Sequence, residues 1–402
     1  MPLYTYIYGE CLVRIWGLTS RQRIERLLVT SGKSTIVNDL SPLQDNDAVL
    51  ILRSDYLFDD RLVNYLAATP NIILQLDEGQ KKVTVAAHVP AGLAHKVLDV
   101  IEGSAPVESL SGVQVQTLGN LSISFQRSLR KFDPPFVLSI SVEKRRDLER
   151  RLFDWSYKGV TDLITKWVWP LPARWVVGQC IRFGVQPNHV TLIGLLLLIL
   201  AGILFVYGHY GWGLLAGWLM TFLDTVDGKL ARVTVTSSRF GHYFDHIIDL
   251  FHPPIWYILW GLGLRMSHPD GLGFSLSSVL WIIVIGYAVG RLTEGVFTWC
   301  LGRFGIFCWR PVDSYFRLMT ARRNPSLVLL TAGALLGRPD LGLLAVAFWT
   351  VLTSIFLVVR LGMATFFRIT QGPLRSWLMD IDKDMNDGSL AVRIFTKRER
   401  TP

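Results

Sequence analysis

The chain has 402 residues, of which half are hydrophobic, and it carries a formal net charge of +9. This apolar content is too high for an average soluble enzyme, and the positive charge favours anionic lipid headgroups or phosphorylated substrates. Nucleic acid is disfavoured as a partner because Lys and Arg gather at the ends of apolar runs and form no single basic stripe. The four cysteines lack metal-binding spacing, which indicates reduced thiols.

The first 140 residues mix polar and apolar positions in short runs. Residues 46–55, 71–78 and 81–89 read as strands, and residues 61–68 and 92–103 read as helices. This alternation predicts a soluble α/β domain with a parallel or mixed sheet. The N-terminus shows no signal-peptide pattern, so we expect this domain to be cytoplasmic.

Residues 141–186 form a basic and aromatic linker. Its apolar residues recur at helical intervals, which predicts an amphipathic helix at a membrane interface, with an ordinary surface helix as the alternative. Residues 369–402 form a basic tail, also expected to be cytoplasmic.

Long apolar runs dominate residues 187–368. There are six of them, and the fifth could extend back to Arg317: 190–207, 211–223, 251–264, 274–290, 326–337 and 341–359. Since about twenty residues cross the hydrocarbon, the predicted fold is an α-helical integral membrane bundle of about six transmembrane helices, preceded by the soluble α/β domain. Lys and Arg concentrate in alternate loops, a positive-inside pattern that places the N-terminus in the cytoplasm.

Four aspartates lie beside the second and third apolar runs, in DTVDGKLARVTVTSSRFGHYFDHIID. Asp224 and Asp227 are three residues apart, and Asp245 and Asp249 are four apart, so each pair shares a helix face. Converging carboxylates repel unless a cation joins them. Oxygen ligands favour Mg²⁺, Mn²⁺ or Ca²⁺ over zinc, and Arg232 could hold a phosphate oxygen. The alternatives are helix caps, a solvated face, or a proton or cation transport pathway.

The stretch resembles the signature of the CDP-alcohol phosphotransferase family. The matching positions, eight over 26 residues, are Asp224, Asp227, Gly228, Ala231, Arg232, Gly241, Asp245 and Asp249. Residues 187–191 (PNHVT) resemble a further element of that family. The resemblance implies a six-helix membrane domain and a homodimer in a bacterial-type inner membrane. The reaction that it implies transfers the phospho-alcohol part of a CDP-alcohol to a second alcohol and releases CMP.

The resemblance also implies roles for the matched residues. Asp224, Asp227, Asp245 and Asp249 would hold one or two divalent ions, Mg²⁺ or Mn²⁺, and Asp249 is also the candidate base for the acceptor hydroxyl. The remaining positions would line the CDP pocket: Gly228, Ala231, Arg232, Gly241, Pro187, Asn188 and Thr191. A metal would neutralise the diphosphate, and a base would let the hydroxyl attack phosphorus.

The next set of residues concerns binding of the acceptor alcohol. Arg317, Arg322 and Arg323, together with Lys158 and Lys166, are either positive-inside anchors or an anion pocket for a phosphorylated acceptor. Members of the family that use inositol phosphate have an acceptor pocket in this area. The expected reaction therefore transfers the phosphatidyl group of CDP-diacylglycerol to inositol phosphate or glycerol phosphate and releases CMP, in phospholipid biosynthesis, with a soluble donor such as CDP-inositol as the alternative.

Two further features are weaker. VLILRSDYLFDD resembles the strand of a nucleotidyltransferase that carries a metal-binding aspartate, here Asp55, although a strand-end turn also explains it. The G-x-G-x-R phosphate loop of that family is missing, so we expect a noncatalytic domain. His242, His246 and His252 flank the acidic helix, and their oxygen-rich surroundings favour packing or substrate-pocket roles over zinc.

Overall fold

The computed structural model divides the chain into two compact units, which are described separately. The first comprises residues 1–126, 133–156 and 233–236, and the second comprises residues 127–132, 157–232 and 237–402. The structure describes residues 2–32, 34–79, 81–121, 125–126, 130–237, 239–267, 275–379, 381 and 389–396. Within these ranges, the side chains of 29–31, 125–126, 239–246 and 266–267 are not described.

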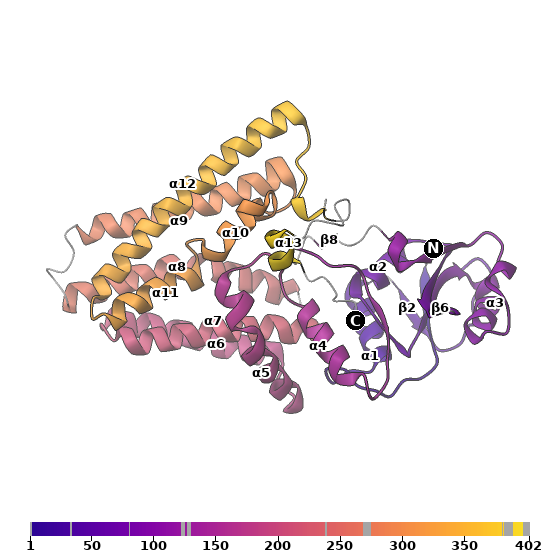
Figure 1. The fold of residues 1–402 in the computed structure, drawn as a ribbon. Helices are drawn as coiled ribbons and strands as arrows, with labels where there is room; N and C mark the ends of the chain where they lie inside the picture. Colours follow the sequence, from indigo (N-terminus) through magenta and orange to yellow (C-terminus); the bar gives the residue numbers. More distant parts are fainter. Residues whose placement is uncertain are drawn as a thin grey trace. The chain divides into compact units, whose positions relative to one another are not determined.

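A six-stranded mixed sheet forms the centre of the first unit (Figure 1). Its strands, in spatial order, are β2 (Thr35–Val37), β1 (Leu3–Tyr8), β3 (Ala48–Arg53), β6 (Lys81–Pro90), β5 (Ile72–Glu78) and β7 (Gln114–Thr117). Strand β6 runs antiparallel to β3 and β5, whereas β1 is parallel to both of its neighbours. The predicted α/β domain with a parallel or mixed sheet is confirmed.

Both faces of this sheet are buried, as the alternation along β3 shows. Leu50 and Leu52 pack on the side covered by helices α1 (Ser20–Ser31) and α2 (Asp60–Ala68). Val49 and Ile51 pack on the side covered by α3 (Ala91–Glu102). Since successive strand residues point to opposite faces, a continuous apolar strand requires helices on both sides.

The predicted end of α3 is also confirmed. Gly103 follows the helix in the left-handed conformation, with φ of 80°, and its amide bonds back to the last turn. Glycine adopts this conformation without steric cost, so it ends the helix at this residue.

Shorter elements complete the first half of the chain. Strands β4 (Tyr56–Phe58) and β10 (Val137–Ser139) pair with each other, and α4 spans Arg145–Trp155. The remaining short strands are β8 (Phe125–Gln126) and β9 (Lys131–Phe132). Asp55 lies in the turn between β3 and β4, where its carboxylate accepts two hydrogen bonds from Arg53, at 2.9 and 2.6 Å.

The second unit is helical (Figure 1). Its long helices are α6 (Pro187–Val206), α7 (Tyr210–Val233), α8 (Arg239–Ser267), α9 (Leu276–Val296) and α12 (Pro339–Gln371). The shorter ones are α5 (Pro170–Arg182), α10 (Pro311–Met319), α11 (Arg323–Leu335) and α13 (Leu390–Phe395), with π-helical segments at Ile164–Val168 and Phe297–Gly302. Helix α8 continues through Pro253 and Pro254.

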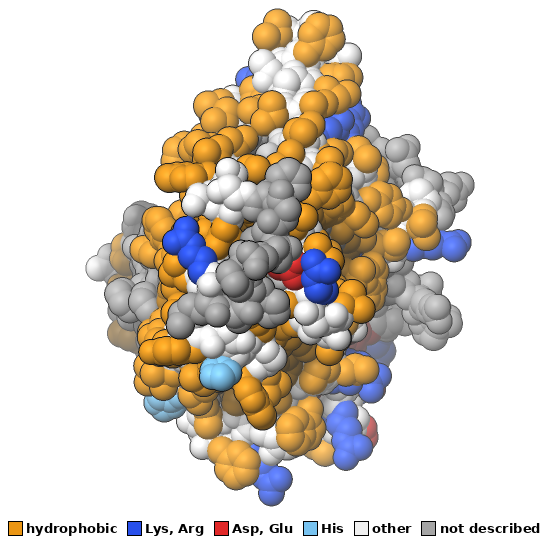
Figure 2. Space-filling view, turned by 90° about the vertical axis from the view of Figure 1, so that its left-hand side faces the viewer, with side chains coloured by type: hydrophobic (Ala, Val, Ile, Leu, Met, Phe, Trp, Pro, Cys, Tyr) orange, Lys and Arg blue, Asp and Glu red, His pale blue; other side chains and the backbone are white. Residues whose placement is uncertain are grey.

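Four helices of the described residues are long and apolar enough to cross a membrane. They are Pro187–Val206, Ile247–Arg265, Leu276–Gly302 and Pro339–Gln371. Their outward-facing side chains are mostly hydrophobic, and Figure 2 shows such side chains over most of the visible face. An integral membrane protein is therefore indicated, but the predicted count of about six spans is not confirmed. The predicted extension of the fifth run back to Arg317 is wrong, because α10 ends at Met319 and α11 begins at Arg323.

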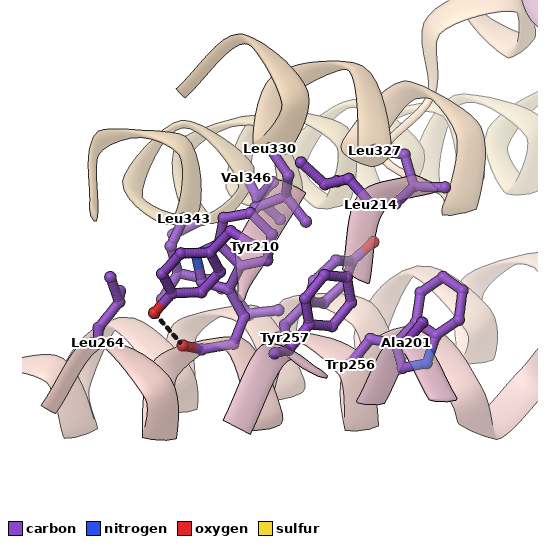
Figure 3. Close-up of a cluster of buried hydrophobic side chains, with 14 of the residues drawn as sticks. Ala201, Tyr210, Leu214, Trp256, Tyr257, Leu264, Leu327, Leu330, Leu343 and Val346 are labelled. Atoms are coloured by element: carbon purple, nitrogen blue, oxygen red, sulfur yellow. Dashed lines mark hydrogen bonds between the residues drawn. The ribbon is translucent and has the colours of Figure 1, made fainter. Parts of the chain in front are cut away.

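One apolar core joins six helices of this unit (Figure 3). It contains Ala201 of α6, Tyr210 of α7, Trp260 of α8, Ile283 of α9 and further residues of α11 and α12. The Tyr210 hydroxyl donates a hydrogen bond of 3.3 Å to the backbone carbonyl of Trp260, and a dashed line marks this bond in Figure 3. Helices α7 and α11 thus belong to the same packed bundle as the four long apolar helices.

Glycines allow some of these helices to approach closely. A Cβ added to Gly263 of α8 would lie 2.1 Å from the backbone oxygen of Phe205 on α6. A Cβ added to Gly333 of α11 would lie 2.6 Å from the Cα of Gly342 on α12. Small residues at such contacts let helix backbones pack together in membranes.

Candidate active site

The acidic motif occupies the facing ends of two helices. Asp224, Asp227, Gly228, Ala231 and Arg232 lie in the C-terminal part of α7, and Gly241, Asp245 and Asp249 lie in the N-terminal part of α8. The two helices are joined by a short connection, as the sequence predicted. The side chains of Asp245, His242 and His246 lie outside the described residues.

Arg323 connects the aspartates of the two helices. Its Nη1 donates to Oδ1 of Asp249 at 2.7 Å, and its Nη2 donates to Oδ2 of Asp224 at 2.5 Å. The three side chains are only partly exposed, between 17% and 41%. One guanidinium therefore bonds a carboxylate from each helix, which shows that Asp224 and Asp249 converge.

Asp227 is held from a third helix. The hydroxyl of Thr191, in the first turns of α6, donates to Oδ2 of Asp227 at 2.7 Å. Pro187 and Asn188 begin the same helix, and Gln186 caps it. The PNHVT element is therefore brought beside the acidic motif, although 36 residues separate Thr191 from Asp227.

The donor set suits a divalent cation. Carboxylate oxygens from α7 and α8 already converge on one positive group, the Arg323 guanidinium, and hard oxygen ligands are those that Mg²⁺ and Mn²⁺ prefer. Among the described residues no three His, Cys, Asp or Glu side chains form a metal-binding group. That finding does not extend to Asp245, one of the four predicted ligands.

Gly228 lies where a side chain would crowd Arg232. A Cβ at Gly228 would stand 3.1 Å from Nη2 of Arg232, one turn further along α7. The Gly-x-x-x-Arg spacing thus leaves the guanidinium lying over the glycine. Both residues are predicted to line the CDP pocket.

Two of the predicted acceptor residues, Arg317 and Arg322, stack on the same ring. Their guanidinium carbons lie 5.6 and 5.4 Å from the centre of the Phe307 ring. Arg322 is ion-paired with Glu294, which also bonds Arg291 at 2.5 Å. Nε and Nη1 of Arg317 are buried and have no hydrogen-bond partner among the described residues.

A buried polar group beside Arg317 was not found by sequence reasoning. Asp162 accepts hydrogen bonds from Thr165 (2.9 Å to its hydroxyl) and from the amide of Asn324 (2.9 Å). Burial acts to raise the pKa of Asp162, but Arg317 and these hydrogen bonds outweigh it and hold the pKa below its usual value. Only an isolated aspartate in YKGVTDLITK could have signalled this group.

The two lysines of that stretch have different surroundings. Lys158 is solvent-exposed, and partial desolvation by the atoms around it, together with the nearby charges of Arg130 and Arg232, lowers its pKa. Lys166 donates to the backbone carbonyl of Gly159 at 2.8 Å and lies 5.2 Å from the centre of the Phe395 ring. Lys166, predicted to bind the acceptor, therefore already has a carbonyl partner.

His252 makes packing contacts, which is one of the two roles that the sequence favoured over zinc binding. Its Nδ1 lies 2.8 Å from the Ile248 carbonyl oxygen, and its ring meets the Trp256 ring edge to face at 5.1 Å between centres. It is nearly fully buried, with 3% of its surface exposed.

Comparison with known proteins agrees with this geometry. The family model described as CDP-alcohol phosphatidyltransferase matches residues 185–301, which include α6, α7, α8 and α9. Residues 185–301 carry a CDP-alcohol phosphatidyltransferase domain. The resemblance predicted from the aspartate motif is confirmed.

Several curated proteins are similar to part of the chain. A phosphatidylinositol phosphate synthase of Mycobacteroides abscessus is 33% identical over 90 residues, which are 21% of this chain and 41% of the relative. An archaetidylinositol phosphate synthase of Pyrococcus horikoshii is 41% identical over 69 residues, or 16% of this chain and 35% of the relative. A cholinephosphotransferase 1 of Danio rerio is 37% identical over 87 residues, which are 19% of this chain and 22% of the relative. The chain thus spans less than half the length of each of these relatives.

Proposed function

We propose that the protein is a membrane phosphotransferase that moves a phospho-alcohol group from a CDP-alcohol to an acceptor alcohol and releases CMP, in phospholipid biosynthesis. The observation that carries the proposal is the convergence of Asp224 and Asp249 on the Arg323 guanidinium, with Asp227 held by Thr191. These residues belong to the matched domain except for Arg323, which α11 brings to the same place.

Asp224, Asp227, Asp245 and Asp249 would hold one or two Mg²⁺ or Mn²⁺ ions, which when bound neutralise the diphosphate and the developing charge on CMP. In this arrangement Arg323 restrains the two carboxylates and offsets their repulsion. Asp249 is the proposed base for the acceptor hydroxyl, because its side chain is more exposed than that of Asp224, the other carboxylate bound by Arg323. The residues that would line the CDP pocket are Gly228, Ala231, Arg232, Gly241, Pro187, Asn188 and Thr191.

The proposed acceptor carries a phosphate, as inositol phosphate or glycerol phosphate does. Arg317 supports this assignment, because a buried guanidinium with two nitrogens that lack a partner among the described residues is costly unless an anion binds it. Two of the similar proteins are named as synthases of inositol phosphate lipids. Arg322, Arg323 and Lys166 complete the proposed acceptor group, and CDP-diacylglycerol is the proposed donor.

We also propose that α7 and α11 join the four apolar helices to make six spans, since all six share one core. The basic residues near α7 and α11 support a cytoplasmic active site and N-terminus. The N-terminal α/β domain, residues 1–140, would be noncatalytic, since Asp55 is already paired with Arg53. The family resemblance further implies a homodimer, which cross-linking in membranes would test.

The test is CMP release by the purified protein with CDP-diacylglycerol, Mg²⁺ or Mn²⁺, and glycerol phosphate, inositol phosphate, serine or inositol as acceptor. Release with one acceptor, abolished by Asp249→Asn and kept by the exposed control Asp77→Asn, supports the proposal. CDP-inositol with a lipid acceptor tests the soluble-donor alternative. If no donor and acceptor pair releases CMP while the protein stays folded and binds metal, the proposal is refuted.

The acceptor assignment is tested separately with Arg317→Gln. We expect the KM for the phosphorylated acceptor to rise about tenfold or more, with little change for the CDP-alcohol, since a hydrogen bond to a charged group is worth about 1.5–3 kcal/mol. A matched Arg317→Lys variant keeps the charge but loses the planar donors. An unchanged acceptor KM in both variants would contradict the assignment.

A further inference from the structure

A cavity in the second unit lies away from the aspartates and is lined by residues outside the matched domain. Its volume is about 430 Å³, within the range of small-molecule sites. The walls come from Trp309 to Pro311, from the end of α12 (Phe367 and Gln371), from residues 372–375 and Trp377, and from Ile381, Ser389 and Val392. Nothing in the proposed reaction uses these residues.

Two arginines supply the charge of this cavity. Arg310 and Arg375 both line it, and neither makes an ion pair with a carboxylate among the described residues. The described lining contains no Asp or Glu. Unlike Arg323 and Arg360, which hold carboxylates, these two guanidinium groups have no carboxylate partner within the described part of the chain.

Aromatic rings orient Arg310. Its guanidinium carbon lies 5.6 Å from the centres of both the Trp309 and the Phe367 rings, which are themselves 5.8 Å apart. Stacking of this kind holds the flat face of a guanidinium and leaves its N–H edge free for the bidentate bonds that phosphate accepts.

The wall of the cavity is rigidly built. The amide of Trp377 donates to the carbonyl of Trp309 at 3.3 Å, and its indole Nε1 donates to Ser314 at 3.0 Å. The guanidinium carbon of Arg360 lies 4.4 Å from the centre of the Trp309 ring. Trp309, one of the two rings that position Arg310, is therefore held by contacts to Trp377 and Arg360.

The position of the cavity points to an amphipathic ligand. It opens where α12, one of the helices able to cross a membrane, ends at Gln371. Met363, Phe366 and Ile369, in the last turns of that helix, are 44%, 64% and 77% exposed. A headgroup in the cavity would leave room for acyl chains along this apolar surface, and basic pockets at helix ends suit anionic headgroups.

We propose that this cavity is a phosphoester-binding site whose ligand is the headgroup of an anionic phospholipid. Arg310 and Arg375 bind the phosphate, and Trp309, Phe367 and Trp377 contact the less polar part of the headgroup. The site is separate from the aspartate centre, so it does not depend on the proposed reaction.

The test is native mass spectrometry of the full chain in neutral detergent with phosphatidylglycerol or phosphatidylcholine, and with glycerol phosphate as the soluble headgroup. We expect one phosphatidylglycerol to be retained in preference to phosphatidylcholine. Arg310→Gln with Arg375→Gln should weaken this retention about tenfold, and the control Arg368→Gln, on α12 but outside the lining, should not. Gln371→Glu, at an exposed position, should weaken it without removing an arginine.

The outcomes separate the possible ligands. Equal retention of phosphatidylglycerol in the double variant and the Arg368→Gln control would overturn the proposal, as would equal retention of the two lipids by the wild type. Binding of glycerol phosphate alone, lost in the double variant, would support the phosphoester site and replace the lipid by a soluble source. A thermal unfolding scan of each variant, together with Gln371→Glu, separates loss of the ligand from loss of the fold.

Discussion

The buried ion pair between α10 and α12 gives a quantitative test of the structure. Nε and Nη2 of Arg360 donate to the two carboxylate oxygens of Asp313, at 2.5 and 2.8 Å. Asp313 is 1% exposed and Arg360 is 9% exposed. Replacing Arg360 by Gln leaves the Asp313 carboxylate buried without its cation, which typically costs about 3–5 kcal/mol.

The free-energy cost of Arg360→Gln can be worked out from the protonation of Asp313 at each pH. Without Arg360 the variant must keep Asp313 protonated, and an ordinary Asp pKa of about 3.9 is about three units below pH 7. Each unit is worth about 1.4 kcal/mol, so the cost is about 4 kcal/mol at pH 7 and about 1.5 kcal/mol at pH 5. Burial already raises the pKa of Asp313 in the intact pair, although Arg360 and the Arg310 amide oppose it. A raised folded pKa gives stability that is present at low pH and is lost as pH rises.

The assay is reversible unfolding in mixed detergent micelles, followed by far-UV circular dichroism at pH 5 and pH 7. Arg360→Gln should be destabilised more at pH 7, and adding Asp313→Asn should restore about half of the loss, because the amide that replaces the carboxylate carries no charge. Arg368→Gln, an exposed position on the same helix, is the matched control. The reasoning would be refuted if Arg360→Gln lost no more unfolding free energy than this control. It would also be refuted if the loss were the same at pH 5 and pH 7.

Three further predictions concern other parts of the chain. Thr191→Val should lower the rate of CMP release about three- to tenfold, because Asp227 loses one hydrogen bond worth about 1 kcal/mol, and an unchanged rate would show that the bond has no role in the reaction. Gly263→Ala should lower the free energy of unfolding by about 1–3 kcal/mol, because the added methyl group clashes with α6. Gly362→Ala, with open space around it, should not lower it. Equal unfolding free energies of the two variants would contradict the packing. Burial lowers the pKa of His88 below its usual value of about 6.5, so the unfolded chain takes up a proton more readily than the folded one. The N-terminal domain should therefore lose stability as pH falls below about 6.5. Hydrogen exchange of β6 measures this loss, and the dependence should disappear in His88→Gln.

The sequence by itself determined the kind of the elements that it predicted and the placing of the aspartates on shared helix faces. Alternating strands and helices up to residue 103, and the apolar runs after residue 187, follow from local periodicity, which depends only on the residues within one element. The same is true of the aspartate spacing, because three or four residues always return to one face of a helix.

Tertiary structure alone decided which distant groups meet. Arg323 reaches Asp224 and Asp249 across 99 and 74 residues, and Asn324 reaches Asp162 across 162. No local pattern encodes such pairings, because they arise from the packing of α11 against other parts of the bundle. The interruption between Met319 and Arg323 likewise depends on packing, since the backbone amide of Ala321 finds its acceptor in the Thr353 hydroxyl of α12.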